Sequence, residues 1–460
     1  MKVTLKQTYT FLFFVGIFFI PFNSYDGIPF LGEYKRDGAV LFFLSAFFVF
    51  LTDSMYKSKL ALPYKNMLFQ FFSLFIFVLC FSVVVNLNTV SQNDLKNTSG
   101  ISRFIRQFIS LGISMSLIVL GYNILKNSTL NKVFLKVRQA FLFSFVVVAL
   151  YGFIEILVIY FNFTNLKSLL LLFDYFPFTD VNLDHLYQRI SSVTLEPPFL
   201  AIYLITIAGW MFSYIITAKG IKKYIPAILV FVLTFFSGSR TALIVVSFQF
   251  IVFLSTIFYI SRRYRSLLQK LLFILGILFL TLMVFNKEKV FSEINKKWES
   301  LNFVEDMKKS ISNRSRFGIQ YTSLLIFQEN PIFGVGFGQQ AYHAVDKYPT
   351  WVTKNNYEFK EMYFNDAVKS FPPGFNLYTR LLAETGIVGT CIFLSFALYL
   401  LVKTRSMIKK AKAMERVILI VLLVSFVGFF INWLQFDSFR MYGFWICLAM
   451  IMRKIQLKYE

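Results

Sequence analysis

Twelve runs of mostly apolar residues dominate this 460-residue chain and constrain what it can fold into. A helix needs about 20 apolar residues to cross a bilayer, and backbone groups in lipid must bond within the segment. The runs therefore predict an all-α, polytopic integral membrane protein with about 12 transmembrane helices. With 57% hydrophobic and 15% charged residues, the composition agrees. The runs lie at residues 8–22, 38–52, 67–86, 105–121, 134–161, 199–217, 224–236, 241–260, 267–285, 377–402, 417–432 and 441–452.

Positive charge is concentrated in alternate segments between these runs. If the N-terminus is cytoplasmic, the inside segments hold 25 Lys and Arg residues against three acids, whereas the rest of the chain holds 22 against 21. Because cytoplasmic loops carry an excess of Lys and Arg, this asymmetry predicts that the N- and C-termini are both cytoplasmic. It also accounts for the net charge of +23, so no nucleic-acid partner is expected.

One outer segment is much longer than the others and divides the chain into three parts. We expect a transmembrane bundle of about nine spans at 1–285, a large outer loop at 286–375, and a C-terminal bundle of about three spans at 376–460. A long loop in a compact protein is usually functional. The two histidines, His185 and His343, show no spacing with carboxylates typical of a metal site, so we expect no metal and no cofactor.

Arginines at the outer ends of the spans are the candidate binding residues. Arg240 stands in a Ser-Gly-Ser-Arg turn, and Arg314 and Arg316 precede an apolar stretch. Arg380 begins the tenth span, four residues before Glu384. Ionisable groups at membrane depth are costly and mark functional sites, and the planar guanidinium group binds diphosphate with two parallel hydrogen bonds. The alternative for Arg240 is an interface anchor, and the alternative for Arg380 is neutralisation by Glu384.

Glu196 lies in a Leu-Glu-Pro-Pro segment just ahead of the run at 199–217. Its carboxylate is a candidate general base if burial raises its pKa. It is equally a candidate cap for the positive end of the following helix.

Four short motifs resemble those of the O-antigen polymerase/ligase superfamily. Ser-Gly-Ser-Arg-Thr-Ala at 237–242 resembles its Ser-Arg segment. Glu196-Pro197, just before a span, is similar to a segment found in polymerases of this superfamily. Arg316, followed by Asn-Pro and by Gly-Val-Gly at 334–336, resembles its Arg…Pro-x-x-Gly-x-Gly stretch in the large periplasmic loop. Phe375-Asn376, nine residues and Gly-Ile-Val-Gly at 386–389 resemble its His-Asn, nine residues, Gly-x-x-Gly motif.

The resemblance implies a glycosyltransferase of lipopolysaccharide biosynthesis in the bacterial inner membrane. It implies a donor glycan on undecaprenyl diphosphate and, for an O-antigen polymerase, a lipid-linked repeat unit as acceptor at the periplasmic face. Membrane lipids and a chain-length regulator protein are the implied partners. The implied catalytic residues are Glu196, Arg240 and Arg316, and the implied substrate-binding residues are Arg240, Arg314, Arg316, Arg380 and Asn376.

Two alternatives to the polymerase stay open at this point. An O-antigen ligase moves finished polymer to lipid A-core, but Phe375 stands where the ligase motif has histidine. A flippase or transporter of lipid-linked oligosaccharide also fits about twelve spans, although transporters usually show two related halves and short loops.

Overall fold

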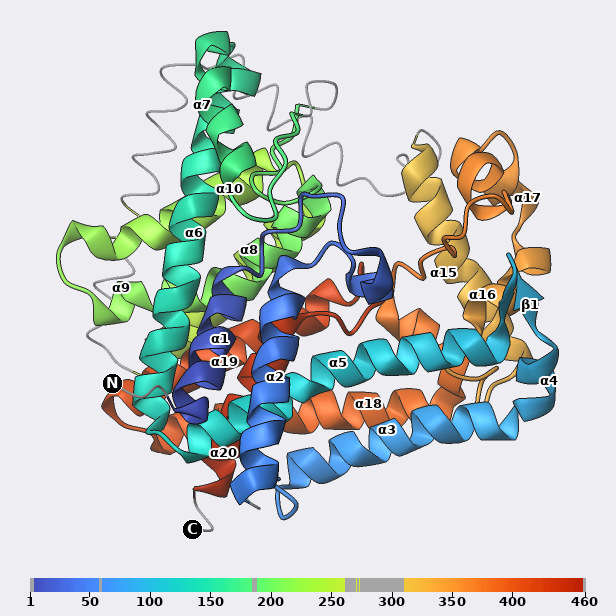
Figure 1. Ribbon diagram of the computed structural model, residues 1–460, viewed down its shortest axis with the longest axis horizontal. Helices are drawn as coiled ribbons and strands as arrows, with labels where there is room; N and C mark the ends of the chain where they lie inside the picture. Colours follow the sequence, from blue (N-terminus) through green and yellow to red (C-terminus); the bar gives the residue numbers. More distant parts are fainter. Residues whose placement is uncertain are drawn as a thin grey trace.

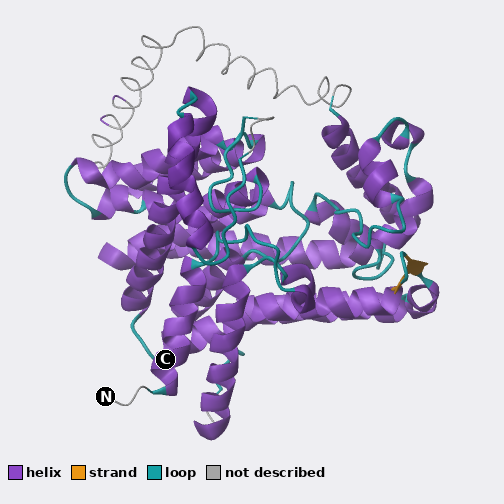
Figure 2. Cartoon of the chain, turned by 45° about the horizontal axis from the view of Figure 1, so that its top comes forward, coloured by secondary structure: helices purple, strands orange, loops and turns teal. Residues whose placement is uncertain are grey.

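The computed structural model describes residues 4–57, 60–183, 188–260, 270, 273 and 310–457, and this part of the chain is almost entirely helical (Figures 1 and 2). Its helices are α1 (Leu5–Phe18), α2 (Gly38–Lys57), α3 (Met67–Val85), α4 (Leu87–Gln92), α5 (Gly100–Lys126), α6 (Leu130–Phe161), α7 (Lys167–Leu171), α8 (Pro197–Phe212), α9 (Tyr214–Thr217), α10 (Ile225–Phe236), α11 (Arg240–Ile260), α15 (Ile311–Glu329), α16 (Gln340–Ala344), α17 (Thr350–Thr353), α18 (Leu377–Lys410), α19 (Ala413–Asn432) and α20 (Tyr442–Gln456). One short hairpin, β1 (Asp94–Leu95) and β2 (Thr98–Ser99), pairs antiparallel.

The all-α polytopic prediction is confirmed. Eleven of the twelve predicted runs fall on described helices, and the run at 267–285 lies outside the described residues except for positions 270 and 273. Among the described helices, eight are long and apolar enough to cross a membrane. They are α2, α3, α5, α6, α8 with α9, α11, α18 and α19. Three further helices coincide with predicted runs but are shorter than a full span: α1 has 14 residues, α10 has 12 and α20 has 15.

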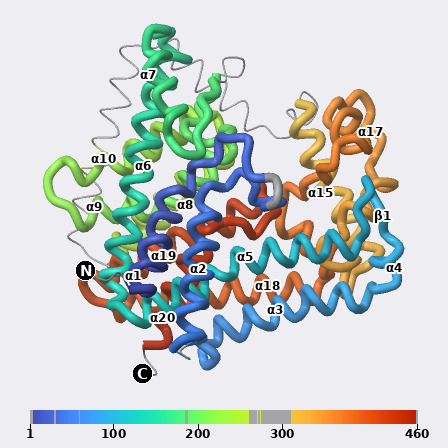
Figure 3. The backbone as a smooth tube through the Cα atoms, viewed as in Figure 1, coloured from blue at the N-terminus to red at the C-terminus, as the bar shows by residue number. Residues whose placement is uncertain are grey.

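The spans form two groups that run in different directions (Figures 1 and 3). In one group α3 and α18 lie side by side, α5 runs in nearly the same direction in this view, and α15 to α17 sit at one end of the group. In the other group α1, α2 and α6 run across the first. The start of α1 and the end of α20 lie close together in Figures 1 and 2, at the end away from α15. Completely buried aromatic side chains, including Trp210, Trp433 and Trp445, fill the interior.

Helix α18 is broken at Gly386, where φ is 62° and ψ is −161°. The segment that follows α15 fills the break with backbone hydrogen bonds. The Ile387 N–H donates to the Pro331 carbonyl at 2.8 Å, and the Val335 N–H donates to the Ala383 carbonyl at 2.9 Å. A Cβ at Gly386 would lie 2.3 Å from the Ile332 carbonyl oxygen, so only glycine fits this approach. The two glycine motifs of the sequence thus meet in one joint between α15 and α18.

The described part of the large loop is also fastened to the β1–β2 hairpin. Lys96 lies in the hairpin turn, and its Nζ donates to the carbonyls of Met362, Val368 and Ser370 at 2.7, 2.8 and 3.1 Å. The loop is therefore held at two places: near residues 331–335 by the joint at Gly386, and at residues 362–370 by Lys96.

Candidate functional site

The segment before α8 brings Arg189 to the turn that carries Arg240. The Ile190 N–H donates to the Phe236 carbonyl at 3.2 Å, so residues 189 and 190 lie against the end of α10. In the turn that follows, Gly238 has a φ of 66°, and a Cβ there would meet the Arg189 side chain at 2.9 Å. Arg240 begins α11 two residues later. Two arginines therefore flank one tight turn, which requires glycine at its centre.

Arg316, on the second turn of α15, faces this pair from the large loop. Burial lowers the pKa of Arg316, the negative charge of Glu358 opposes that shift, and the positive charges of Arg189 and Arg240 lower the pKa further. Arg189 and Arg240 are therefore both close enough to act on Arg316. Because like charges repel, such a cluster becomes more favourable when an anion binds between its members.

The guanidinium group of Arg316 is only partly bonded within the described residues. Its Nε is buried and has no hydrogen-bond partner in that part of the chain. Its guanidinium carbon lies 5.3 Å from the ring centre of Phe375, a cation–π contact. Phe375 has a φ of 55°, a backbone conformation that is strained for an aromatic residue. An unbonded donor held by a strained neighbour is typical of a binding site.

Asn376, a predicted substrate-binding residue, caps α18. Its Oδ1 accepts from the N–H groups of Tyr378 and Thr379 at 2.9 and 3.3 Å, and its Nδ2 donates to Oε1 of Gln320 at 3.3 Å. An asparagine cap satisfies helix N–H groups that otherwise have no partner. The structure thus gives Asn376 a structural task beside Arg316, at the point where α15 and α18 meet.

Arg380 is bonded to protein groups through all three of its nitrogen atoms. Nε donates to Oε1 of Glu384 at 3.1 Å, Nη1 to the Asp437 carbonyl at 3.0 Å, and Nη2 to Oε1 of Gln107 at 3.1 Å. Gln107 in turn donates to Glu33. Arg380 and Glu384 are 8% and 2% exposed. Glu384 therefore neutralises Arg380, as the alternative interpretation of the sequence predicted.

The two remaining predicted residues lie at the edges of the site. Arg314 donates from Nη2 to the Asn355 carbonyl at 3.0 Å, while its Nε is buried without a partner in the described chain. Glu196 is the N-cap residue of α8, but its side chain makes no capping hydrogen bond and is exposed. Neither the burial expected of a general base nor the expected side-chain cap is therefore seen at Glu196.

Glu155, which sequence reasoning did not single out, is a completely buried carboxylate in α6. Its Oε1 accepts from the Ser191 N–H at 3.0 Å and its Oε2 accepts from the Ser192 N–H at 2.8 Å. These bonds hold the segment that carries Arg189. An acid within an apolar run was the sequence signal for it.

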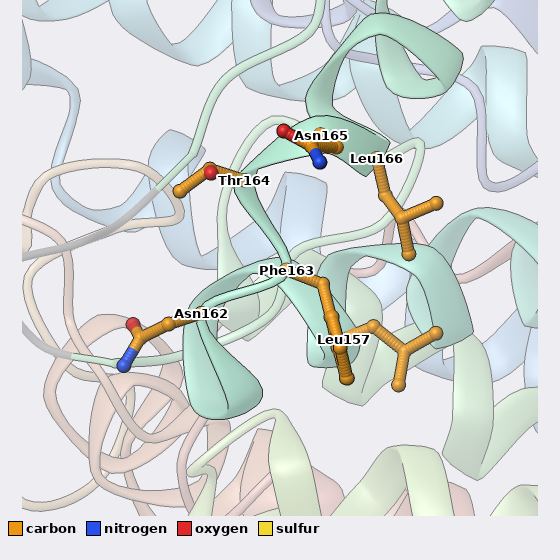
Figure 4. Close-up of a pocket in the computed structure, with 6 residues that line it drawn as sticks. All are labelled: Leu157, Asn162, Phe163, Thr164, Asn165 and Leu166. Carbon is orange, nitrogen blue, oxygen red and sulfur yellow. The ribbon is translucent and has the colours of Figure 1, made fainter.

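A depression of about 480 Å³ at the end of α6 is lined by Leu157, Leu166 and the segment 162–165, none of them titratable (Figure 4). No group of three or more His, Cys, Asp or Glu side chains suited to a metal occurs among the described residues, which leave out His185.

Comparison with known proteins places a family over most of this site. Residues 225–394 match the family model described as O-antigen ligase. This stretch contains Arg240, Arg316 and the joint at Gly386, whereas Arg189 and Glu155 precede it. No curated protein matches the chain.

Proposed function

We propose that this chain is an O-antigen polymerase. The match over residues 225–394 supports the resemblance to the O-antigen polymerase/ligase superfamily, whose members are glycosyltransferase-like enzymes. The superfamily implies a lipid-linked polysaccharide substrate in the membrane. In the proposed reaction the donor is a glycan on undecaprenyl diphosphate. The acceptor is the terminal sugar of another lipid-linked repeat unit, at the periplasmic face of the inner membrane. Both termini are cytoplasmic in this proposal, and a chain-length regulator is its proposed protein partner.

The observation that carries the proposal is the convergence of Arg189, Arg240 and Arg316. Transfer of the glycan breaks the bond between the anomeric carbon and the diphosphate, and negative charge builds up on the leaving oxygen. Preorganised donors directed at developing charge are usually the largest contribution to catalysis. Each guanidinium group can give a diphosphate two parallel hydrogen bonds. Arg316 carries the clearest support, because its buried Nε has no partner among the described residues.

Phe375 favours the polymerase over the ligase. The corresponding histidine is implied to help activate the acceptor of ligases, and a phenylalanine ring cannot accept a proton. The arginine cluster does not separate the polymerase from a flippase, since the cargo of a flippase carries the same diphosphate. The deletion experiment does.

Deletion of the gene from the native host tests the reaction. If the protein is the polymerase, lipid A-core carrying a single repeat unit remains and the ladder of longer products disappears from a polysaccharide gel. Loss of the single-repeat band as well, with repeats retained on the lipid carrier, would instead indicate a ligase or a flippase.

Complementation of the deleted strain tests the cluster. Arg240→Ala and Arg189→Ala should each lower polymer formation by about 10²- to 10³-fold, the usual cost of removing one transition-state donor. Arg240→Lys should restore only part of this, because lysine keeps the charge and loses the fork. Arg106→Ala is the matched control, since Arg106 is exposed and donates to the side chains of Ser102 and Thr98, away from the cluster. Full-length polymer from the Arg240→Ala protein would refute the diphosphate clamp.

A further inference from the structure

Glu358 is held beside Arg316 by a set of bonds between the large loop and α15. The Asn355 carbonyl accepts from Nη2 of Arg314 at 3.0 Å, and Nδ2 of Asn356 donates to Oγ of Ser315 at 2.9 Å. The Glu358 N–H then donates to Oδ1 of Asn356 at 3.1 Å. Two consecutive positions of α15, just before Arg316, thus fix the short turn from which Glu358 projects.

Glu358 lies between the arginines and an apolar part of the loop. Its side chain is half-buried, and it lies in the chain next to Phe359, which belongs to an apolar cluster with Ile319, Val352 and Tyr363. Of the charged neighbours of Arg316, Glu358 acts on it most strongly. Within the described residues the Glu358 carboxylate forms no ion pair. It is therefore near the cluster without being bound to one of its members.

Other carboxylates of the described chain are placed less well for this task. Glu384 is paired with Arg380 at 3.1 Å, and both oxygens of Glu155 accept from backbone N–H groups. Glu361 is exposed and lies 4.0 Å from Lys360. Glu196 is exposed at the start of α8.

We propose that Glu358 is the catalytic base, a role that rests on the proposed polymerase function. The acceptor hydroxyl oxygen forms a bond to the anomeric carbon of the donor glycan, and the bond from that carbon to the diphosphate oxygen breaks. The hydroxyl proton passes to the Glu358 carboxylate and from there to water. The electron pair of the broken bond leaves on undecaprenyl diphosphate, beside Arg316. Base and leaving-group clamp then lie next to each other at the start of α15.

The experiment measures polymerisation by the purified full-length protein in lipid nanodiscs, supplied with undecaprenyl-diphosphate-linked repeat units from the native host. We expect Glu358→Gln to lower the turnover rate by about 10²- to 10⁴-fold, the usual contribution of general base catalysis. Glu361→Gln, three residues further along the same loop, is the matched control and should retain the wild-type rate.

A second variant separates a lost base from a damaged fold. Sodium formate should restore part of the rate to Glu358→Ala, because a small carboxylate can occupy the space that the side chain leaves. The same salt should give no gain to Arg316→Ala. A wild-type rate in Glu358→Gln, or a slow Glu358→Ala that formate does not accelerate, would overturn the assignment of Glu358. Failure of the wild-type protein to extend the repeat units would instead overturn the proposed function.

Discussion

The guanidinium carbon of Arg316 lies 5.3 Å from the ring centre of Phe375, so the residue at the usual histidine position of the motif supports an arginine of the site. A phenylalanine there cannot exchange a proton, but its ring face attracts a cation. Phe375 has a strained φ of 55° and directly precedes Asn376, the residue that caps α18. Phe375 therefore differs in chemistry from the histidine of the motif that it resembles, and it lies beside Arg316.

Replacing Phe375 with leucine should weaken this support. A cation–π contact contributes about 0.5–2 kcal/mol, so we expect Phe375→Leu to lower polymer yield by about 2- to 30-fold. Phe375→Tyr keeps an aromatic face and should retain most of the yield. Both substitutions place an ordinary L side chain at the same strained backbone, which makes them matched. Equal yields from the two variants would show that the ring does not position Arg316.

The joint between α15 and α18 should tolerate no side chain at its glycines. At Gly334, with a φ of 65°, a Cβ would lie 2.4 Å from the Glu384 carbonyl carbon. We expect Gly334→Ala and Gly386→Ala to lower the melting temperature of the detergent-solubilised protein and to abolish polymer formation. Gly112→Ala in α5 is the control. Beyond the adjacent backbone of α5, no atom of the described residues lies within 4 Å of the position that its added methyl group would take, so the substitution should be neutral or stabilising. If Gly334→Ala and Gly386→Ala both kept the melting temperature of the wild type, the close backbone packing between α15 and α18 would be refuted.

Much of this fold follows from the sequence, because hydropathy is a local signal. Each run from 38–52 to 241–260 lies on a helix, since about 20 apolar residues in lipid have few alternatives to helical structure. Helix ends were less predictable. Leu130–Phe161 begins four residues before the predicted run, since its first turn is polar and hydropathy alone does not detect it. The start of α18, by contrast, coincides with the predicted residue, because Asn376 caps it there.

The site was less predictable, because proximity between distant segments has no local signal. Arg316 and Arg240 stood out through their motifs, but Arg189 reaches them only because Ile190 bonds to the end of α10. Glu358 depends in the same way on bonds from Asn356 to α15. Asn376 stood out through a motif that the structure explains as a helix cap. Motifs therefore mark where the elements join as well as where chemistry takes place.

Breaking the Arg380–Glu384 pair should destabilise the protein. Both side chains are buried, so Glu384→Leu leaves a buried cation with too few partners, at a cost of about 3–5 kcal/mol. We expect lower yield and melting temperature for this variant. The double variant Arg380→Met/Glu384→Leu should recover much of the loss, because it removes both charges together. A double variant as unstable as the single one would show that the bonds of Arg380 to Asp437 and Gln107 matter more than the ion pair.

Glu155 should act on the site through the segment that carries Arg189. In Glu155→Ala the buried N–H groups of Ser191 and Ser192 lose their acceptors, at a cost of about 1–3 kcal/mol each. We expect this variant to melt earlier and to make less polymer, and Glu155→Gln, which keeps one oxygen acceptor, to fall between it and the wild type.

A double-mutant cycle separates this positioning role from general stability. If Glu155 acts by holding Arg189, then Glu155→Ala should lower polymer yield much less when Arg189 is already alanine. Its effect on the melting temperature should be the same in both backgrounds, because the lost backbone bonds do not involve the arginine side chain. Additive losses of polymer yield would contradict the link and would leave Glu155 as a stabilising residue of α6 alone.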